Sequence, residues 1–271
     1  MSGENSGQEA RPGPVVRELA DCGALIVGGT SGIGLSSALA LARGGVSGIV
    51  LVGRSADRGL LAQQRFVDEG LPKPQFVAGD AVRPESAQEI ADRAAELLPG
   101  IDILLSSTAP DVRPEPFGRM PLGDIGSVLS QLALAPLQMS GAVIPHMRRR
   151  GGGSIITVAS DTGKTATPGE SVIGAAMAAI IMFTRTLAIE EKRYGIRANV
   201  LTPSLVEGTI TAEKVTKDGF SAKLFAKAAQ AASLGVARPE DLGELVAFLA
   251  GPGAAKLTGQ AISVNGGISA A

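Results

Sequence analysis

The fold of this 271-residue chain is decided by the stretch Leu25-Ile26-Val27-Gly28-Gly29-Thr30-Ser31-Gly32-Ile33-Gly34. Its leading apolar residues are typical of a buried strand, and the glycines that follow are typical of a tight turn that opens a helix. Gly28, Gly32 and Gly34 have the spacing that lets a backbone approach a pyrophosphate closely, at the positive end of a helix dipole. The stretch therefore predicts the start of a nucleotide-binding α/β domain.

The rest of the chain alternates short apolar segments with helical ones. Strands are expected at 24–27, 48–52, 75–78, 102–105, 154–158, 197–201 and 261–264. Helices are expected at about 32–43, 57–69, 84–98, 122–150, 169–193 and 239–250. This alternation is typical of a parallel sheet with helices on both faces. The sequence therefore predicts an α/β fold: a single Rossmann-type doubly wound domain around a seven-stranded parallel sheet.

Two segments fall outside this alternation. Residues 1–20 are polar and rich in Gly, Glu and Pro, so we expect a disordered N-terminal tail before a domain that spans 21–271. Residues 209–234 are helical in pattern, rich in Ala and Lys, and follow the sixth strand. A segment there lies outside the carboxyl ends of the strands, where open α/β sheets bind their ligands. We expect it to be a substrate lid.

Composition argues against several classes of function. The formal net charge of −1 gives no electrostatic basis for binding nucleic acid or an anionic membrane. We find no signal-peptide core and expect no stretch long enough to span a bilayer. Cys22 and His146 are the only residues of their kinds, so we expect no disulfide, no metal site and no Ser-His-Asp triad. The single cysteine fits a reducing cytoplasm. The run Arg148-Arg149-Arg150 ends a helix, where basic side chains interact favourably with the helix dipole.

The residues after the second expected strand indicate which nucleotide binds. An acidic side chain there would accept hydrogen bonds from the ribose hydroxyls of NAD. This chain has Gly53-Arg54 instead. No carboxylate repels a 2′-phosphate, and a guanidinium can pair with one through two hydrogen bonds. The sequence therefore predicts NADPH or NADP as the cofactor.

Further segments, in the same order along the chain, resemble the short-chain dehydrogenase/reductase family from about Gly23 to Gly267. The glycine turn is similar to the family's Thr-Gly-x-x-x-Gly-x-Gly, with Val27 in place of the Thr. Ser106-Ser107-Thr108-Ala109 stands where the family has Asn-Asn-Ala-Gly, and Asn265-Gly266-Gly267 resembles its closing signature. The resemblance implies a dinucleotide site made of Gly28, Thr30, Ser31, Gly32, Ile33, Gly34, Arg54, Asp80, Ala81, Ser107, Pro203, Val206 and Thr209.

The family's catalytic positions are largely replaced. The resemblance aligns Ser160 with the catalytic serine, but it places Ile173 and Met177 where the family has its Tyr and Lys. The fourth family residue, an Asn, aligns with Leu132, or with Gln131 if the alignment slips by one residue. The resemblance therefore implies an active site that retains the serine and has apolar side chains at most of its other catalytic positions.

Hydride transfer would then need another source for the proton. The chain's only tyrosine is Tyr194, which lies elsewhere in the sequence. Loss of a general acid costs roughly 10²–10⁴-fold in rate, but hydride transfer persists because the cofactor carries that chemistry. Iminium ions, conjugated enones and quinone-like rings need no proton on oxygen in the same step. Several polar residues near Ser160 could supply a proton, and Asp161 and Lys164 are the favoured ones. The others are Glu170, Ser171 and Thr202.

We therefore expect an atypical NADPH-dependent reductase that acts on a hydrophobic, conjugated or polycyclic metabolite of the carbonyl or iminium type. Two alternatives stay open: a non-redox cyclase or isomerase, and a catalytically inactive binding subunit on the same scaffold. The expected partners are a small hydrophobic substrate and further copies of the chain. The segment from Thr258 to Gly267 resembles one that packs across a dyad, and we expect a homotetramer rather than a dimer.

Overall fold

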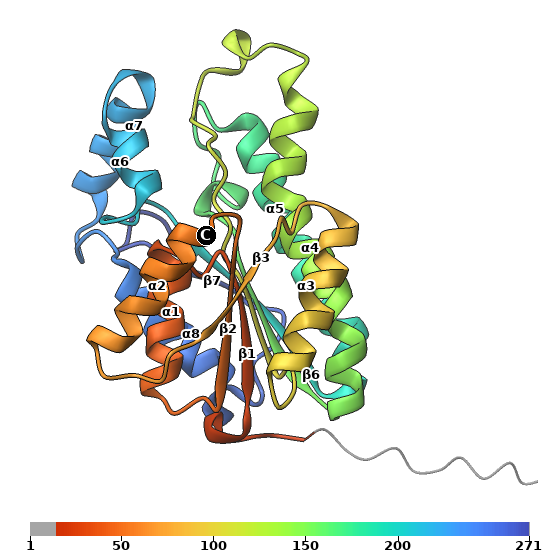
Figure 1. Cartoon of the computed structure of the whole chain (residues 1–271). Coiled ribbons are helices and arrows are strands. Elements are labelled where there is room, and N and C mark those ends of the chain that lie inside the picture. Colours follow the sequence, from red (N-terminus) through yellow and green to blue (C-terminus); the bar gives the residue numbers. More distant parts are fainter. Residues whose placement is uncertain (1–14, 271) are drawn as a thin grey trace, which may run out of the picture.

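Seven parallel strands form one sheet in the order β3-β2-β1-β4-β5-β6-β7 (Figure 1). This computed structural model describes residues 15–270, so most of the expected N-terminal tail lies outside the described residues. The strands are β1 (Gly23–Val27), β2 (Gly48–Gly53), β3 (Gln75–Ala78), β4 (Ile103–Ser106), β5 (Gly153–Val158), β6 (Ile196–Pro203) and β7 (Ala261–Val264). β1 is buried along its whole length, as a central parallel strand covered on both faces should be. The predicted fold class is confirmed.

Helices cover both faces of the sheet (Figure 1). The main ones are α1 (Gly32–Arg43), α2 (Ala56–Asp68), α3 (Pro84–Leu97), α4 (Asp124–Arg150), α5 (Ser171–Glu191) and α8 (Pro239–Ala250). α1, α2 and α8 share one apolar core with Ala24 and Ile26 of β1. α3, α4 and α5 share another with Leu25 and Val27, because neighbouring side chains of a strand point to opposite faces.

Short elements complete the described part of the chain. The 3₁₀ helices are η1 (Leu19–Asp21), η2 (Phe117–Arg119), η3 (Asp161–Gly163), η4 (Lys192–Tyr194) and η5 (Pro252–Ala254). The segment 209–234 folds into α6 (Ile210–Thr216) and α7 (Gly219–Ala231), which lie beyond the carboxyl ends of the strands (Figure 1). α5 begins two residues later than expected, because Gly169 just before it has a φ of +84°, which a helix cannot continue.

Two helices are long and apolar enough to cross a membrane by length and composition alone. They are Asp124–Arg150, with a mean hydropathy of 1.3, and Ser171–Tyr194, with 2.0. The expectation that no stretch is long enough was therefore wrong on that criterion. Both helices contribute side chains to the core beneath the sheet, including Met139, Val143 and Leu187. Core helices of folded proteins pass the same test, so it is weak evidence for a membrane span.

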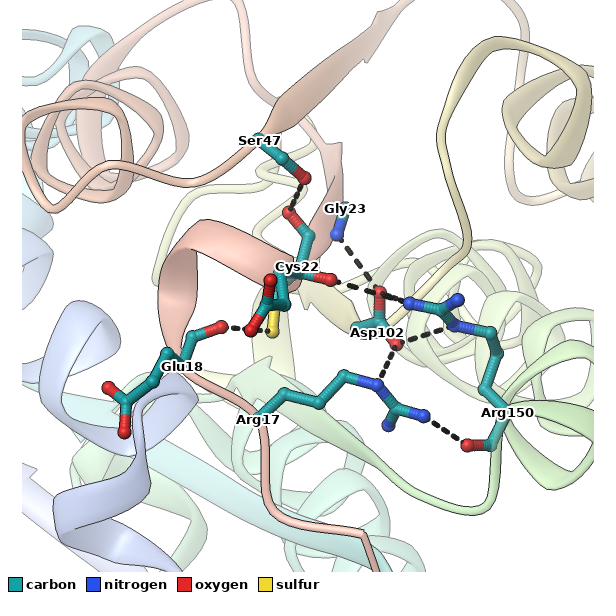
Figure 2. A network of polar contacts seen from close by, with 8 residues as sticks. Arg17, Glu18, Cys22, Gly23, Ser47, Asp102 and Arg150 are labelled. Carbon is teal, nitrogen blue, oxygen red and sulfur yellow. Dashed lines mark hydrogen bonds and ion pairs between the residues drawn. The ribbon is translucent and has the colours of Figure 1, made fainter.

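Residues 15–20, which the sequence placed in a disordered tail, lie on the domain near the amino ends of β1 and β4 (Figure 2). Asp102 is the centre of the contacts there and is only 3% exposed. Its carboxylate accepts hydrogen bonds from the Gly23 N–H and from Nε and Nη2 of Arg150, each at 3.0 Å. Arg17 Nε lies 3.6 Å from the same carboxylate. The chain before β1 is thus tied to the end of α4.

The arginines that end α4 have specific partners beyond the helix dipole. Arg150 pairs with Asp102, and Arg148 pairs with Glu191 of α5 through Nε, at 2.8 Å, and Nη2. Cys22 lies beside the Asp102 network with a buried thiol. Burial, followed by the negative charge of Asp102, raises the pKa of that thiol to about 11. Cys22 is therefore an uncharged, unreactive packing residue at neutral pH.

Candidate active site

The glycine turn between β1 and α1 has a backbone that only glycine fits. Gly28 has a φ of +79° and Gly32 a φ of +51°, both in the left-handed region. A β-carbon on Gly28 would lie 2.3 Å from the carbonyl oxygen of Ser107, and one on Gly34 would lie 2.3 Å from the oxygen of Gly28. Ser107 in turn donates its N–H to Val27 O at 2.9 Å. The turn is therefore packed against the residue that follows β4.

This position is the switch point of the sheet, because the strand order reverses between β1 and β4. Open α/β sheets bind ligands at that point, outside the carboxyl ends of the strands. Ser31 is the N-cap residue of α1 and makes no capping hydrogen bond with its side chain. Ile33 packs against the core below. The turn thus presents the amino end of a helix and a close-fitting backbone cradle, which suits a pyrophosphate.

The predicted nucleotide-selecting residues line the same edge of the sheet. The methyl group of Thr30 lies 2.8 Å from where a β-carbon on Gly53 would stand. Arg54 follows with an exposed side chain that makes no hydrogen bond or ion pair with the described residues. Gly79 donates its N–H to Gly53 O at 3.1 Å, and the Asp80 carboxylate accepts from Val82 N at 3.2 Å. Next to Asp80, Ala81 is buried in the core.

The predicted residues after β6 come back to the glycine turn. Pro203 ends the strand, and Val206 bridges to Ala237. Thr209 caps α6: its Oγ1 accepts from Ala212 N at 3.1 Å and donates to Val206 O at 2.8 Å. The structure thus brings every predicted cofactor residue to the carboxyl edge of the sheet.

Ser160 stands at the carboxyl end of β5 and is partly buried. It caps η3, with Oγ accepting from the Thr162 N–H at 3.5 Å. Ile173 and Met177, on the first turns of α5, are 8% and 7% exposed. They belong to an apolar cluster with Val128, Ala159, Val172, Ile180, Ile181 and Val200, against which Val112, Met120, Ile125, Leu129, Leu132, Ala133, Leu137 and Ala261 pack. We call this group the apolar floor.

The structure distinguishes the two alignments of the fourth catalytic position. Leu132 packs on the apolar floor, whereas Gln131 is exposed and donates its amide to Ser127 Oγ at 2.7 Å. Leu132 is therefore the α4 residue that faces the site. Both α4 and α5 thus contribute apolar side chains to the floor next to Ser160.

Asp161 and Lys164, the favoured substitutes for the missing acid, are engaged with the C-terminal segment. Asp161 is 5% exposed and accepts from Asn265 Nδ2 at 3.3 Å and from the Ser269 hydroxyl. Lys164 Nζ donates to Ser263 Oγ at 2.6 Å and lies 3.9 Å from Asp161 Oδ1. Burial lowers the pKa of Lys164, opposed by Asp161. These contacts fasten η3 to the end of β7, so they give both side chains a structural role.

The remaining polar candidates differ in their surroundings. Ser171 is exposed, and Thr202 is fully buried with a hydroxyl that has no partner among the described residues. Glu170 directly precedes α5, and burial raises the pKa of its carboxyl, while a hydrogen bond with Thr162 acts in the opposite direction. The sequence ranked Glu170 behind Asp161 and Lys164.

The connection between β4 and α4 contacts the α6–α7 segment. Asp111 and Arg113, in the connection between β4 and α4, pair with Lys214 at 2.9 Å and with Asp218 at 3.7 Å in the α6–α7 segment. The same connection is fastened to the approach to α5, where Glu115 N donates to Gly169 O at 2.8 Å. The α7 residue Phe220 also packs on Gly169, with its ring where a β-carbon would stand. Among residues 15–270 there is no group of three or more His, Cys, Asp or Glu side chains that could hold a metal ion.

Comparisons with known proteins identify the class to which this fold and site belong. A family model described as enoyl-(acyl carrier protein) reductase matches residues 27–269. The human dehydrogenase/reductase SDR family member 4 is 31% identical, over 97% of this chain and 93% of that protein. The chain therefore belongs to the short-chain dehydrogenase/reductase family of oxidoreductases, as the resemblance implied.

Solved structures agree with this assignment. A gluconate 5-dehydrogenase from Burkholderia cenocepacia J2315, in complex with NADP and tartrate, has a TM-score of 0.82 at 27% identity, over 92% of this chain and 96% of that chain. A 7α-hydroxysteroid dehydrogenase, complexed with NADH and 7-oxo glycochenodeoxycholic acid, has a TM-score of 0.84 at 24% identity, over 92% and 95% of the two chains. At that identity the second structure supports the fold alone.

Proposed function

We propose that this protein is an atypical NADPH-dependent reductase that delivers a hydride to a hydrophobic acceptor without a tyrosine acid. The observation that carries the proposal is the combination of a close-fitting glycine cradle with an apolar floor. Gly28 and Gly32 have a conformation and a spacing that suit a pyrophosphate. Ile173 and Met177, aligned with the family's Tyr and Lys, are buried in the floor and offer no proton.

The bound cofactor would supply the hydride, and this chain's residues would hold and select it. The backbone of the glycine turn would bind the pyrophosphate at the amino end of α1. Arg54, exposed beside the turn, would pair with a 2′-phosphate and thereby favour NADPH over NADH. NADP is the cofactor in the similar gluconate 5-dehydrogenase structure, which supports this choice.

The substrate would lie on the apolar floor with its reacting group near Ser160. An apolar surface with few polar groups favours a hydrophobic ligand, and conjugated or polycyclic carbonyl and iminium compounds fit that description. Ser160 would donate a hydrogen bond to the substrate oxygen. The α6–α7 segment would act as the lid, because its ion pairs with Asp111 and Arg113 connect it to the segment between β4 and α4. We propose a cytoplasmic homotetramer as the working form.

Cofactor titration followed by turnover measurements tests the proposal. Purified protein is titrated with NADPH and NADH by fluorescence, and then mixed with NADPH and a panel of quinones, enones and cyclic iminium salts. We expect NADPH to bind more tightly and to be oxidised in equal amount to the product formed. The double variant Ile173→Tyr, Met177→Lys should not raise turnover, because polar groups would crowd an apolar cluster.

Two other results would replace the proposal. A substrate that is transformed without oxidation of NADPH would indicate a cyclase or isomerase on the same scaffold. Tight NADPH binding without turnover of any acceptor in the panel would indicate a binding subunit.

A further inference from the structure

The loop that carries Ser160 is held from two sides. Ser160 directly precedes η3, and its carbonyl oxygen accepts from Gly163 N at 3.0 Å. On one side η3 packs on α5, where a β-carbon on Gly163 would lie 2.8 Å from the carbonyl carbon of Met177. On the other side the buried carboxylate of Asp161 is bound by the C-terminal segment 263–269. The orientation of Ser160 therefore depends on how Asp161, the next residue, is held.

Asn265 lies at the centre of these C-terminal contacts, and it is buried. Its Nδ2 donates to Asp161 Oδ2 at 3.3 Å, and to the carbonyl oxygen and Oγ of Ser269, each at 3.2 Å. Its Oδ1 accepts from Gly267 N at 3.0 Å. The Ser269 hydroxyl also donates to Asp161 Oδ2, so the three side chains close a ring of hydrogen bonds. Because an amide supplies both donors and an acceptor, an apolar side chain cannot take the place of Asn265.

The residue after Asn265 receives the chain that leaves the lid. Gly266 O accepts from Leu234 N at 3.0 Å. Gly266 has a φ of +65°, and a β-carbon on it would lie 1.9 Å from Gly235 O. α7 ends just before these two lid residues. Asn265 and Gly266 therefore lie between the base of the lid and the loop that carries Ser160.

We propose that Asn265 is a positioning residue of the reductase, which fixes Ser160 through Asp161 and joins that serine to the base of the lid. This inference rests on the proposed function, in which Ser160 donates a hydrogen bond to the substrate oxygen. Asn265 needs no contact with substrate or cofactor for this role. A displacement of the reacting groups by about 1 Å can lower a rate by about 10²-fold. Asp161 then acts as a hydrogen-bond acceptor for the C-terminal segment, and not as the missing acid.

Hydrogen exchange tests the link without cofactor or substrate. Asn265→Ala leaves the buried carboxylate of Asp161 with one donor fewer, which is strongly disfavoured for a buried charge. The carboxylate should move and loosen η3. We therefore expect faster exchange of the Gly163 and Thr165 amides, which donate to Ser160 O and Asp161 O. Unchanged exchange of both amides in folded Asn265→Ala would overturn the proposal.

Two further variants keep this test decisive. Ser269→Ala removes the ring member closest to the chain end, a milder change that should speed exchange of the same amides by a smaller factor. Asn199→Ala is the matched control, since Asn199 is also a buried asparagine tied to the C-terminal part of the chain: Nδ2 donates to Leu257 O at 3.0 Å, and Oδ1 accepts from Gln260 N at 3.1 Å. It should lower the melting temperature without changing exchange in η3. Equal acceleration in Asn199→Ala and Asn265→Ala would indicate general loosening and contradict the specific link.

Turnover with NADPH and 9,10-phenanthrenequinone tests the positioning role. Asn265→Ala should lower kcat by about 10- to 100-fold and leave the KM for NADPH within about twofold of wild type. Asn199→Ala should keep the wild-type kcat below its melting temperature. The double variant Asp161→Ala, Asn265→Ala should be no slower than the slower of its two single variants, because both remove the same contact.

Asp161→Asn distinguishes positioning from acid catalysis. The asparagine keeps an oxygen that can accept from Asn265 and Ser269, so kcat should fall by less than about 10-fold, whereas loss of a general acid would cost about 10²–10⁴-fold. A loss in that larger range would assign the proton to Asp161 and remove the basis for the positioning role.

The outcomes separate this inference from the proposed function. A wild-type kcat in folded Asn265→Ala would refute the role of Asn265 and leave the reductase function standing. Losses that multiply in the double variant would refute it as well. Absence of NADPH oxidation by wild type with every acceptor would refute the proposed function, while hydrogen exchange would still decide whether Asn265 holds η3.

Discussion

The side chain of Thr209 lies against Gly32: its Cγ2 atom is 3.4 Å from where a β-carbon on Gly32 would stand. Thr209 caps α6, the first helix of the proposed lid, and Gly32 opens α1 at the proposed pyrophosphate cradle. Two segments that are far apart in the sequence thus share one contact surface. A cofactor bound at the turn would touch the base of the lid, so cofactor binding should order α6.

Gly28→Ala should weaken cofactor binding. The new methyl group would lie 2.3 Å from Ser107 O, in a backbone conformation that alanine rarely adopts. The turn would have to move, and we expect NADPH affinity to fall by at least about 10-fold, with a loss of stability of about 1–3 kcal/mol. Fluorescence titration and urea unfolding measure the two effects. Gly118→Ala, at a site with open space around it, is the control and should change neither.

Arg54→Ala should weaken NADPH binding by about 10- to 100-fold, which corresponds to about 1.5–3 kcal/mol for a hydrogen bond to a charged group. NADH affinity should stay unchanged, because NADH lacks the 2′-phosphate. Calorimetric titration with both cofactors provides the comparison. Arg93→Ala on α3, whose guanidinium pairs with Glu96 on the surface, serves as the control. An equal effect on both cofactors would remove the basis for assigning Arg54 to the 2′-phosphate.

Asp102→Ala should destabilise the fold without involving the active site. It would leave Arg150 and the Gly23 N–H without their buried acceptor, and we expect a loss of about 3–5 kcal/mol. The comparison is Glu96→Gln, which breaks an exposed pair and should cost at most about 1 kcal/mol. Urea unfolding at neutral pH measures both. A loss as small as that of Glu96→Gln would show that the Asp102 network contributes little.

The contact between Asp111 and Lys214 should make the lid sensitive to acid. The hydrogen bond from Lys214, and then its charge, lower the pKa of Asp111 from its ordinary value of 3.8. At a pH above 3.8, the Asp111 carboxylate is charged and stabilises the folded contact with Lys214. This stabilisation is lost as the pH falls through the lowered pKa of Asp111. Hydrogen exchange of the α6 amides should therefore speed up in acid, after correction for the intrinsic rate. Lys214→Met should show no such step, and added salt should weaken the contact in wild type.

Self-association is expected through exposed apolar side chains. Met182 and Ile189 on α5 are 60% and 61% exposed and lie seven residues apart on one face of the helix. We expect a homotetramer by light scattering, and Ile189→Glu should reduce its size by placing a charge in an apolar interface. Thr186→Ser, a milder change between the two, is the control. A wild-type monomer at working concentrations would contradict the prediction.

The fold could be predicted from the amino-acid sequence alone. The local pattern was informative because a short apolar run of β-branched and aliphatic residues favours a buried strand, and the glycines after it can adopt the positive φ angles that the turn requires. The order of the later segments then gave the family, and the comparisons confirmed it. For the arginines at the end of α4, the sequence predicted only an interaction with the helix dipole. It did not reveal the ion pair of Arg150, because the partner Asp102 is 48 residues away in the sequence.

Tertiary structure decided how the polar residues around Ser160 divide their roles. Asp161, Lys164 and Glu170 look equivalent in the sequence, since all three are ionisable residues of one loop. Folding brings Asn265 and Ser269 to Asp161, and Ser263 to Lys164, so the first two have fixed partners. Glu170 is half-buried just before α5, and burial raises the pKa of its carboxyl. The sequence lists which groups can carry a proton, but only the packed chain gives each of them its burial and its neighbours.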